Sequence, residues 1–400
     1  MARVILHNGV VITPQRSLAG GLIMDDGRIV SVFDTAGDGF CPAPEDTVID
    51  VNGQYITPGF IDIHTHGAGG ADFMDGTVEA FLQGAETHLQ YGTTTVVPTT
   101  LTSTMDELYR TLDLFREAKK ASTHGPCLYG LHLEGPYFSM EQRGAQDPRY
   151  IKHPDRSEYM QVLDYSDDIV RWTLAPELPG ALEMARVLKE RGIIASIGHS
   201  DAIYEEVLDA VAAGFDLVTH LYSGMSGLKR IHGYRYAGVI ETALLVDQLF
   251  VEVIADGHHL PESLLKLIYK NKGSDRICLV TDSMRAAGMP AGTYRLGSLT
   301  DGQEVLVEDG VAKLPDRTAF AGSVATANIL LKTMVEVAGV SPQQAVTMLT
   351  ATPAQVLGIQ DHKGTLAPGK QGDVVVMDKN FQVTQVYVGG TQVVPAAQRS

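Results

Sequence analysis

The chain has 400 residues, among them 48 acidic and 31 basic side chains, and its formal net charge is −17. A surface this acidic repels nucleic acid and anionic lipid, so we expect neither as a partner. The hydrophobic share of 44% and the charged share of 20% are those of a globular protein. Three widely separated cysteines, short apolar runs and a first segment without a signal-peptide pattern predict a cytoplasmic protein without a membrane span.

The first 56 residues predict short strands. Apolar runs flank Asn8-Gly9 and again Asp26-Gly27, and both dipeptides favour two-residue hairpin turns. Residues 366–400 have the same texture, for example in the run GDVVVMD. We therefore expect a small β-sandwich domain built from residues 1–56 and 366–400, with a catalytic domain of residues 57–365 between them.

Between the two ends, short apolar runs alternate with helical patterns. The intervening segments, such as residues 181–192 and 202–214, carry apolar side chains at three- and four-residue spacing and end in glycine. A β-rich excursion is expected at residues 292–320, followed by helices near 324–338 and 342–349. The alternation predicts an α/β fold, a (β/α)8 TIM-like barrel, with strands at residues 57–63, 94–98, 127–133, 170–175, 194–197, 217–219, 250–254 and 277–280.

Polar side chains cluster at the predicted strand ends, where barrels of this kind carry their chemistry. His64 and His66 lie two residues apart, so both imidazoles point to the same side of the first strand. Glu134, His199 and His220 close later strands. Imidazole and carboxylate together suit a divalent metal, so we expect one or two ions, with zinc favoured over iron, manganese or cobalt. A core histidine or a turn-capping carboxylate is the alternative for each residue taken singly.

Asp282 closes the eighth strand, and a carboxylate beside a metal can take a proton from water and return it to a leaving group. A turn-capping aspartate is the structural alternative. His259 is the candidate for polarising a substrate carbonyl, whereas His258 is expected to face elsewhere. The loop after strand six gathers four side chains that could bind an anion: Lys229, Arg230, His232 and Arg235. Their spacing alone does not indicate which of them does so. The histidines expected to be structural or on the surface are His88, His124, His153 and His362.

The motifs PGFIDIHTHG, HLEGPY, GHS, THLYSGMS, DGHH and VTDSM follow one another in this order. Together with the split terminal domain, they resemble the amidohydrolase superfamily and, within it, the N-acetylglucosamine-6-phosphate deacetylase family. The resemblance implies metal-dependent hydrolysis of the N-acetyl group of N-acetyl-D-glucosamine 6-phosphate to glucosamine 6-phosphate and acetate, in amino-sugar catabolism. It implies metal ligands at Glu134, His199, His220, His64 and His66, a general acid/base at Asp282, a carbonyl contact at His259, and Arg235 as the contact to the phosphate of a neighbouring subunit's substrate, hence a homodimer.

Three departures from the family pattern concern substrate contacts. Ser223 and Gly224 stand where the family has Asn-Ala, the loop that follows is longer, and Gln146 stands where a histidine is frequent. We therefore treat Gln146, Ser223 and Gly224 as substrate-binding candidates. N-acetylgalactosamine 6-phosphate, or another N-acyl amino sugar phosphate, is the alternative substrate, and a non-catalytic amidohydrolase-like binding protein is the second alternative.

Overall fold

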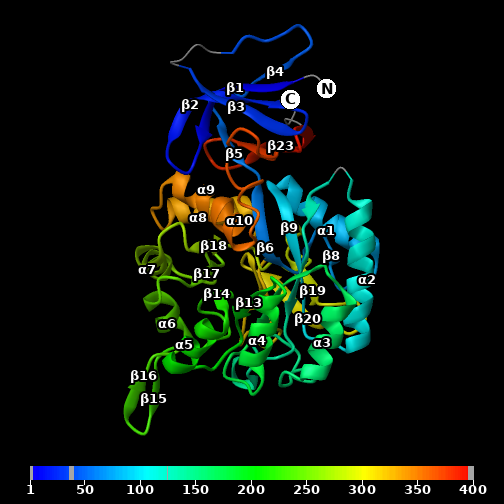
Figure 1. Cartoon of the computed structure of the whole chain (residues 1–400), viewed down its shortest axis with the longest axis vertical. Helices are drawn as coiled ribbons and strands as arrows, with labels where there is room; N and C mark the ends of the chain where they lie inside the picture. The colour runs from blue at the N-terminus through cyan, green and yellow to red at the C-terminus, as the bar shows by residue number, and fades with distance from the viewer. Residues whose placement is uncertain (1–2, 36–39, 124, 395–400) are drawn as a thin grey trace.

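The computed structural model describes residues 3–35, 40–123 and 125–394. A parallel β-barrel surrounded by helices forms most of the molecule, and a sheet built from both ends of the chain lies at one end of the barrel (Figure 1). The predicted (β/α)8 barrel with a β domain from both termini is confirmed.

The barrel strands occur where the short apolar runs predict them. Backbone bonds beyond the strand ends join the last strand to the first: the N–H of Asp282 donates to the carbonyl of His64 at 2.9 Å, and the N–H of His66 donates to the carbonyl of Ser283 at 2.8 Å. The barrel is therefore closed beside the predicted site. Its strands are β6 (Phe60–Thr65), β9 (Thr93–Thr100), β11 (Leu131–Glu134), β12 (Ile169–Leu174), β13 (Ile194–Ile197), β14 (Phe215–Val218), β17 (Phe250–Val253) and β18 (Ile277–Leu279), with the short β10 (Cys127–Leu128) beside β9.

Helices cover the outside of the barrel, with their apolar faces buried against it. The Gly214 that ends one of them has φ 119°, a conformation that glycine adopts without steric cost. The helices are α1 (Val78–Gln90), α2 (Met105–Ala121), α3 (Arg156–Tyr165), α4 (Ala181–Glu190), α5 (Tyr204–Ala213), α6 (Val239–Leu245), α7 (Glu262–Lys272), α8 (Ala327–Glu336), α9 (Pro342–Leu349) and α10 (Ala351–Val356), with a 3-10 turn at Met140–Gln142. No helix within the described ranges is long and apolar enough to cross a membrane.

The terminal sheet has a hydrophobic core of its own, which includes Leu6, Leu22 and Val376. Its strands run in the order β24-β23-β22-β5-β1-β2-β3, and β4 also pairs with β1. The domain boundaries after residues 56 and 365 stay a prediction. The strands are β1 (Val4–Ile12), β2 (Ser17–Asp25), β3 (Arg28–Asp34), β4 (Thr47–Asp50), β5 (Tyr55–Pro58), β22 (Val374–Met377), β23 (Val383–Val388) and β24 (Thr391–Val394).

One of the two predicted hairpin turns is wrong. Asp26-Gly27 does connect β2 to β3, but β1 continues straight through Asn8-Gly9. The register of β1 against β2 shifts between Leu6 and Gly9, and Asn8 has φ 58°, so the dipeptide forms a bulge inside the strand. A left-handed residue favours a turn, but a bulge can hold it as well. Here the apolar residues on both sides of Asn8-Gly9 belong to one buried strand, so the dipeptide forms a bulge.

Three further β elements follow barrel strands in the chain. The predicted excursion is a three-stranded antiparallel sheet of β19 (Gly292–Leu296), β20 (Gln303–Glu308) and β21 (Val311–Lys313). The hairpin of β15 (Lys229–Ile231) and β16 (Tyr234–Tyr236) projects from the body at the end opposite the terminal sheet (Figure 1). A two-stranded ribbon of β7 (Gly67–Ala68) and β8 (Ala71–Asp72) follows β6.

Candidate metal centre

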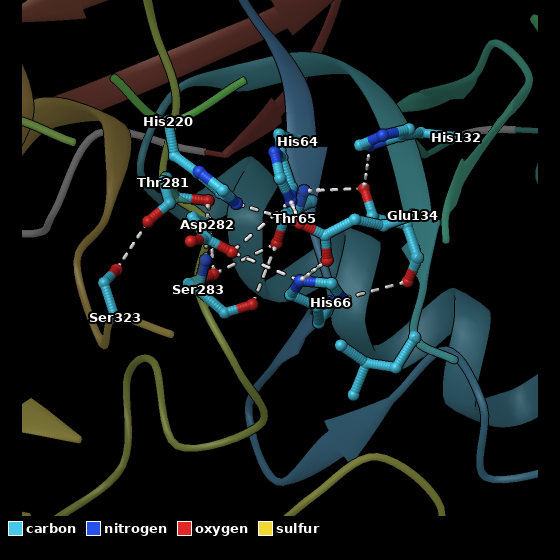
Figure 2. A network of polar contacts seen from close by, with 12 residues as sticks. His64, Thr65, His66, His132, Glu134, His220, Thr281, Asp282, Ser283 and Ser323 are labelled. Atoms are coloured by element: carbon cyan, nitrogen blue, oxygen red, sulfur yellow. Dashed lines mark hydrogen bonds and ion pairs between the residues drawn. The ribbon is translucent and has the colours of Figure 1, made fainter. Parts of the chain in front are cut away.

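Glu134, at the end of β11, lies among four histidines from three other strand ends. Its Oε1 is 3.0 Å from Nε2 of His220, 3.3 Å from Nε2 of His199 and 3.6 Å from Nε2 of His64. Its Oε2 is 3.4 Å from Nε2 of His66. All five side chains are buried, and Figure 2 shows His64, His66 and His220 directed toward the carboxylate. The structure thus brings together every residue predicted to bind metal, as two groups that share Glu134.

The chemistry of this cluster fits a divalent cation. Among the described residues, Nε2 of His64 has no hydrogen-bond partner although it is buried, and such an atom is rare without a ligand. Burial opposes the charged form of Glu134, but the surrounding imidazoles outweigh it and hold the pKa of this carboxyl well below its usual range. Burial also lowers the pKa of His66, yet its bonds to Asp282 and Glu134 raise that pKa to about 9. The cluster therefore favours positive charge, which an ion bound to these nitrogen and oxygen atoms would supply.

Three of these strand-end residues have a left-handed backbone. The φ angles of His199, His220 and Asp282 are 48°, 27° and 44°. Each such residue costs about 1–3 kcal/mol, and the cost is tolerated mainly at functional sites. Next to them, a Cβ on Gly224 would lie 2.8 Å from Nδ1 of His199, so glycine at this position leaves room for the ring.

Asp282 lies beside the histidines of the first strand. Its Oδ1 is 3.2 Å from Nε2 of His66 and 3.4 Å from Nε2 of His64. Burial raises the pKa of Asp282, but these imidazoles outweigh the burial and lower it below its usual value. The carboxylate is therefore charged and available as a proton acceptor.

His259 is held by a neighbouring carboxylate. Its Nδ1 lies 2.7 Å from Oδ2 of Asp256, and its ring centroid is 4.7 Å from that of Phe320. Burial disfavours the charge on Asp256, but His259 outweighs this effect and lowers the pKa of the carboxyl. The ring is fixed at the wall of the cavity described next, whereas His258 is exposed.

A cavity of about 210 Å³ opens beside the cluster. It contains the predicted substrate-binding residues Gln146, Ser223, Gly224 and His259, as well as Asp282. Its wall is partly apolar, and no described lysine or arginine lines it. The residues that contribute this apolar part are Leu101, Ala145, Leu296, Ala319 and Phe320.

Arg235 is the one predicted site residue that lies apart from both the metal-binding cluster and this cavity. It is exposed on β16, in the projecting hairpin, as are Arg230 and His232 on the same hairpin. Lys229 is paired with Asp201. The structure therefore does not bring Arg235 to the cavity of its own chain.

Gln146 makes a contact that sequence reasoning did not anticipate. Its Nε2 donates a hydrogen bond to Oε2 of Glu134 at 2.9 Å, and its Oε1 accepts one from the backbone N–H of Thr102 at 3.0 Å. The amide orientation is thus set by two partners. Gln146 both lines the cavity and orients the central carboxylate.

Sequence reasoning also missed Arg171 on β12 and Glu252 on β17. Both are fully buried and form an ion pair inside the barrel, directly below the cluster. The available signal was a single charged residue in each of two otherwise uncharged strands, IVRWTL and FVEV. Charged residues are almost never fully buried without a partner, so a pair on separate strands could have been suspected.

The remaining histidines have other roles or environments. His88 is buried with Nε2 at 2.9 Å from Oγ1 of Thr65, and burial lowers its pKa to about 4. His132, on β11, is buried between Thr99 and Thr173, and burial holds its pKa well below the usual range, so it is a neutral structural residue. The other positions singled out in the sequence are His153 and His362, both exposed, and His124, which lies outside the described residues.

Comparison with known proteins agrees with this geometry. The model of the amidohydrolase family matches residues 55–393. The chain is 33% identical to an N-acetylgalactosamine-6-phosphate deacetylase of Escherichia coli O157:H7, over 86% of this chain and 89% of the relative. It is 36% identical to an N-acetylglucosamine-6-phosphate deacetylase of Vibrio furnissii, over 86% of this chain and 84% of the relative.

A solved structure has the same architecture over nearly its whole length. The crystal structure of N-acetylglucosamine-6-phosphate deacetylase from Pasteurella multocida superposes with a TM-score of 0.89 at 29% identity, covering 98% of this chain and 100% of the other. The match therefore includes the terminal sheet as well as the barrel. Because the family model and relatives above 30% identity each extend over most of its length, the chain belongs to the amidohydrolase family.

Proposed function

We propose that the protein is a metal-dependent deacetylase that hydrolyses the N-acetyl group of N-acetyl-D-glucosamine 6-phosphate, giving glucosamine 6-phosphate and acetate in amino-sugar catabolism. The observation that carries the proposal is the convergence of Glu134 and four histidines beside a cavity that Asp282 also lines. Relatives of this name, at 36% identity over most of the chain, support the substrate.

Each residue at the cavity has a defined part in this reaction. His64, His66, Glu134, His199 and His220 would hold one or two divalent ions, zinc foremost, and a bound ion supplies Lewis-acid polarisation of water and of the amide carbonyl. Asp282 accepts the proton that the attacking water loses and returns it to the amide nitrogen as the C–N bond breaks. His259, oriented by Asp256 through Nδ1, presents its other ring nitrogen to the carbonyl oxygen.

A deacetylation assay across 6-phosphorylated N-acetyl hexosamines, with metal analysis of the same preparation, tests the proposal. We expect stoichiometric acetate and free amine from N-acetylglucosamine 6-phosphate, and loss of this activity after chelation with recovery on adding Zn²⁺. Metal-independent activity, or a metal-loaded protein that cleaves no N-acyl amino sugar phosphate, would refute it.

N-acetylgalactosamine 6-phosphate is the second candidate substrate. The E. coli O157:H7 relative carries that name, and Gln146, Ser223 and Gly224, which depart from the resembled pattern, all line the cavity. The two sugars differ in one hydroxyl, and a site that hydrogen-bonds a hydroxyl can discriminate strongly. The ratio of kcat/KM for the two sugars decides between them.

Gln146→Ala should reduce kcat/KM because it removes the donor that orients Glu134. A hydrogen bond to a charged group contributes about 1.5–3 kcal/mol, so we expect a loss of about 10- to 100-fold. Gln343→Ala is the matched control, because the Gln343 amide bonds the carbonyl of Pro14 in the terminal domain, away from the cavity. Steady-state kinetics of both variants provide the measurement, and equal values for the two would show that the Gln146 contact is unimportant.

The phosphate group needs a cation that the cavity lacks among its described lining residues. We therefore propose a homodimer in which the projecting hairpin of one subunit places Arg235 at the cavity of the other. The hairpin carries exposed apolar side chains suited to a partner surface: Tyr234 is 73% exposed and Leu228, at its base, is 65% exposed. A guanidinium can bind two phosphate oxygens at once.

Arg235→Ala should raise KM for the phosphorylated substrate by about 10- to 100-fold, the worth of a charge-assisted contact. An unphosphorylated N-acetyl hexosamine should be affected little. Arg28→Ala, which changes an exposed arginine on β3 of the terminal sheet, is the control. If KM is unchanged in Arg235→Ala, the phosphate contact belongs to Lys229, Arg230 or His232.

The cytoplasm is the location that we propose. All three cysteines, Cys41, Cys127 and Cys278, are free thiols, which agrees with a reducing compartment. A small phosphorylated sugar also suits such a compartment as the partner molecule.

A further inference from the structure

An ion pair inside the barrel lies directly beneath the metal-binding cluster. Arg171 and Glu252 are both fully buried. The guanidinium donates from Nε to Oγ of Ser196 at 2.7 Å, from Nη2 to Oγ1 of Thr219 at 2.8 Å, and from Nη1 both to the carbonyl of Ile63 at 3.2 Å and to Oε1 of Glu252. Partners on β6, β13 and β17 and at the residue that follows β14 therefore fix the guanidinium, and its charge is compensated by Glu252.

The second oxygen of Glu252 contacts two residues of the cluster. Its Oε2 is 3.0 Å from Nδ1 of His64 and accepts a hydrogen bond from the backbone N–H of His220 at 3.1 Å. His220 is a residue whose φ of 27° is strained. The Glu252 carboxylate thus contacts both groups of the cluster. It supports the His64 side chain in one group (His64, His66, Glu134) and the His220 backbone in the other (Glu134, His199, His220).

The contact with Nδ1 determines what the other ring nitrogen of His64 can do. A carboxylate only accepts, so Nδ1 carries the proton and donates, and Nε2 of the neutral ring keeps its lone pair. That Nε2 is the buried atom without a hydrogen-bond partner, at 3.6 Å from Oε1 of Glu134 and 3.4 Å from Oδ1 of Asp282. Outer carboxylates of this kind orient ligating histidines and strengthen metal binding.

We propose that Glu252, held in place by Arg171, is a positioning residue that selects the tautomer and orientation of His64. It thereby sets the affinity of the cation held by His64, His66 and Glu134. The inference rests on the metal dependence of the proposed function and extends it to residues that do not touch the ion. A purely structural ion pair would stabilise the barrel without affecting one cation more than the other.

Glu252→Gln tests the proposal. The amide keeps the size of the side chain, but it can either accept from or donate to Nδ1, so it no longer selects one tautomer. Because this variant leaves Arg171 buried without a counter-charge, the double variant Glu252→Gln/Arg171→Met, which removes both charges, is made in parallel. Each metal-free protein is titrated with Zn²⁺ against a competing chelator, and Co²⁺ absorption spectra report the ligand environment.

In the wild type we expect two ions per chain. The second ion is the one held by His64, His66 and Glu134, and the first is the one held by Glu134, His199 and His220. In both variants the second ion should bind about 10- to 100-fold more weakly, the usual effect of losing a residue that orients a metal ligand. The first ion should bind nearly as before. The control is Asp373→Asn, which removes the buried carboxylate of a terminal-domain residue from its pair with Lys363 and should change neither ion.

Three results would overturn the inference: a wild type that binds one ion only, a double variant that binds both ions with wild-type affinity, or an equal loss at both sites. These outcomes are separate from the fate of the proposed function. Selective loss of the second ion in a protein that deacetylates no sugar phosphate would support the role of Glu252 and refute the deacetylase. Normal deacetylation with an unaffected second ion would support the deacetylase and refute the role of Glu252.

Discussion

Asp282→Asn should retain the fold and the bound metal and lose about 10²- to 10⁴-fold in kcat, the usual contribution of a positioned acid–base group. The asparagine amide occupies the same space next to His66, but it cannot take a proton from water or return one to the leaving nitrogen. KM should change little, because the proton is transferred only as the reaction proceeds. Steady-state kinetics, with metal analysis of the same preparation, measure both effects.

The control for this substitution is Asp301→Asn, which changes an exposed carboxylate that pairs with Arg149 outside the cavity. Its kcat should equal that of the wild type. Near-normal turnover of Asp282→Asn would remove the acid–base role from this residue. Loss of metal in parallel with turnover would instead show that Asp282 serves mainly as a ligand.

Glu134→Gln should have the other large effect, a loss of metal affinity greater than about 100-fold. Loss of a residue that only orients a metal ligand lowers metal affinity by up to about 100-fold, and Glu134 lies within the cluster itself. The substitution removes the carboxylate that both groups share and leaves four buried imidazoles around a neutral amide. Deacetylation should fall with metal content, because no other described side chain belongs to both groups.

Metal content by mass spectrometry and acetate release measure the outcome for Glu134→Gln. Glu158→Gln is the control, because that carboxylate pairs with Lys152 and Tyr137 on the outside of the barrel. A Glu134→Gln protein that keeps both ions would contradict the shared-ligand role. One that loses the ions and still deacetylates would contradict the metal-dependent mechanism.

Local patterns were sufficient for the elements of the barrel. Strands alternate with helices because apolar runs alternate with amphipathic segments, and α4 buries Ala181, Met184, Ala185 and Leu188 at the spacing that the sequence predicts. The strand-end histidines could be assigned to one rim for the same reason, since parallel barrel strands all end on one face. The failure at Asn8-Gly9 shows the limit of such patterns: a left-handed residue suits a turn or a bulge, and pairing with β2 decided for the bulge.

Contacts between distant segments could not be predicted in this way. Gln146 bonds Glu134, and Glu252 bonds His64 across 188 positions of the chain, yet neither has a periodicity or motif that marks its partner. Charge marked four candidates in this loop, and only the family resemblance singled out Arg235. Its place on a projecting hairpin, away from its own cavity, depends on how β15 and β16 pair. These relations depend on strand order and closure rather than on neighbouring residues.

The sequence by itself therefore determined the barrel, the rim on which the chemistry lies and the identity of the ligand types, because hydrophobic spacing and residue chemistry are local properties. Only the tertiary structure decided that four histidines surround the Glu134 carboxylate. It also placed a buried arginine–glutamate pair in contact with this cluster. The physical reason is that barrel closure brings β6 next to β18 and places β12 and β17 across one interior. Buried charges are stable only with partners, and those partners come from strands far apart in the chain.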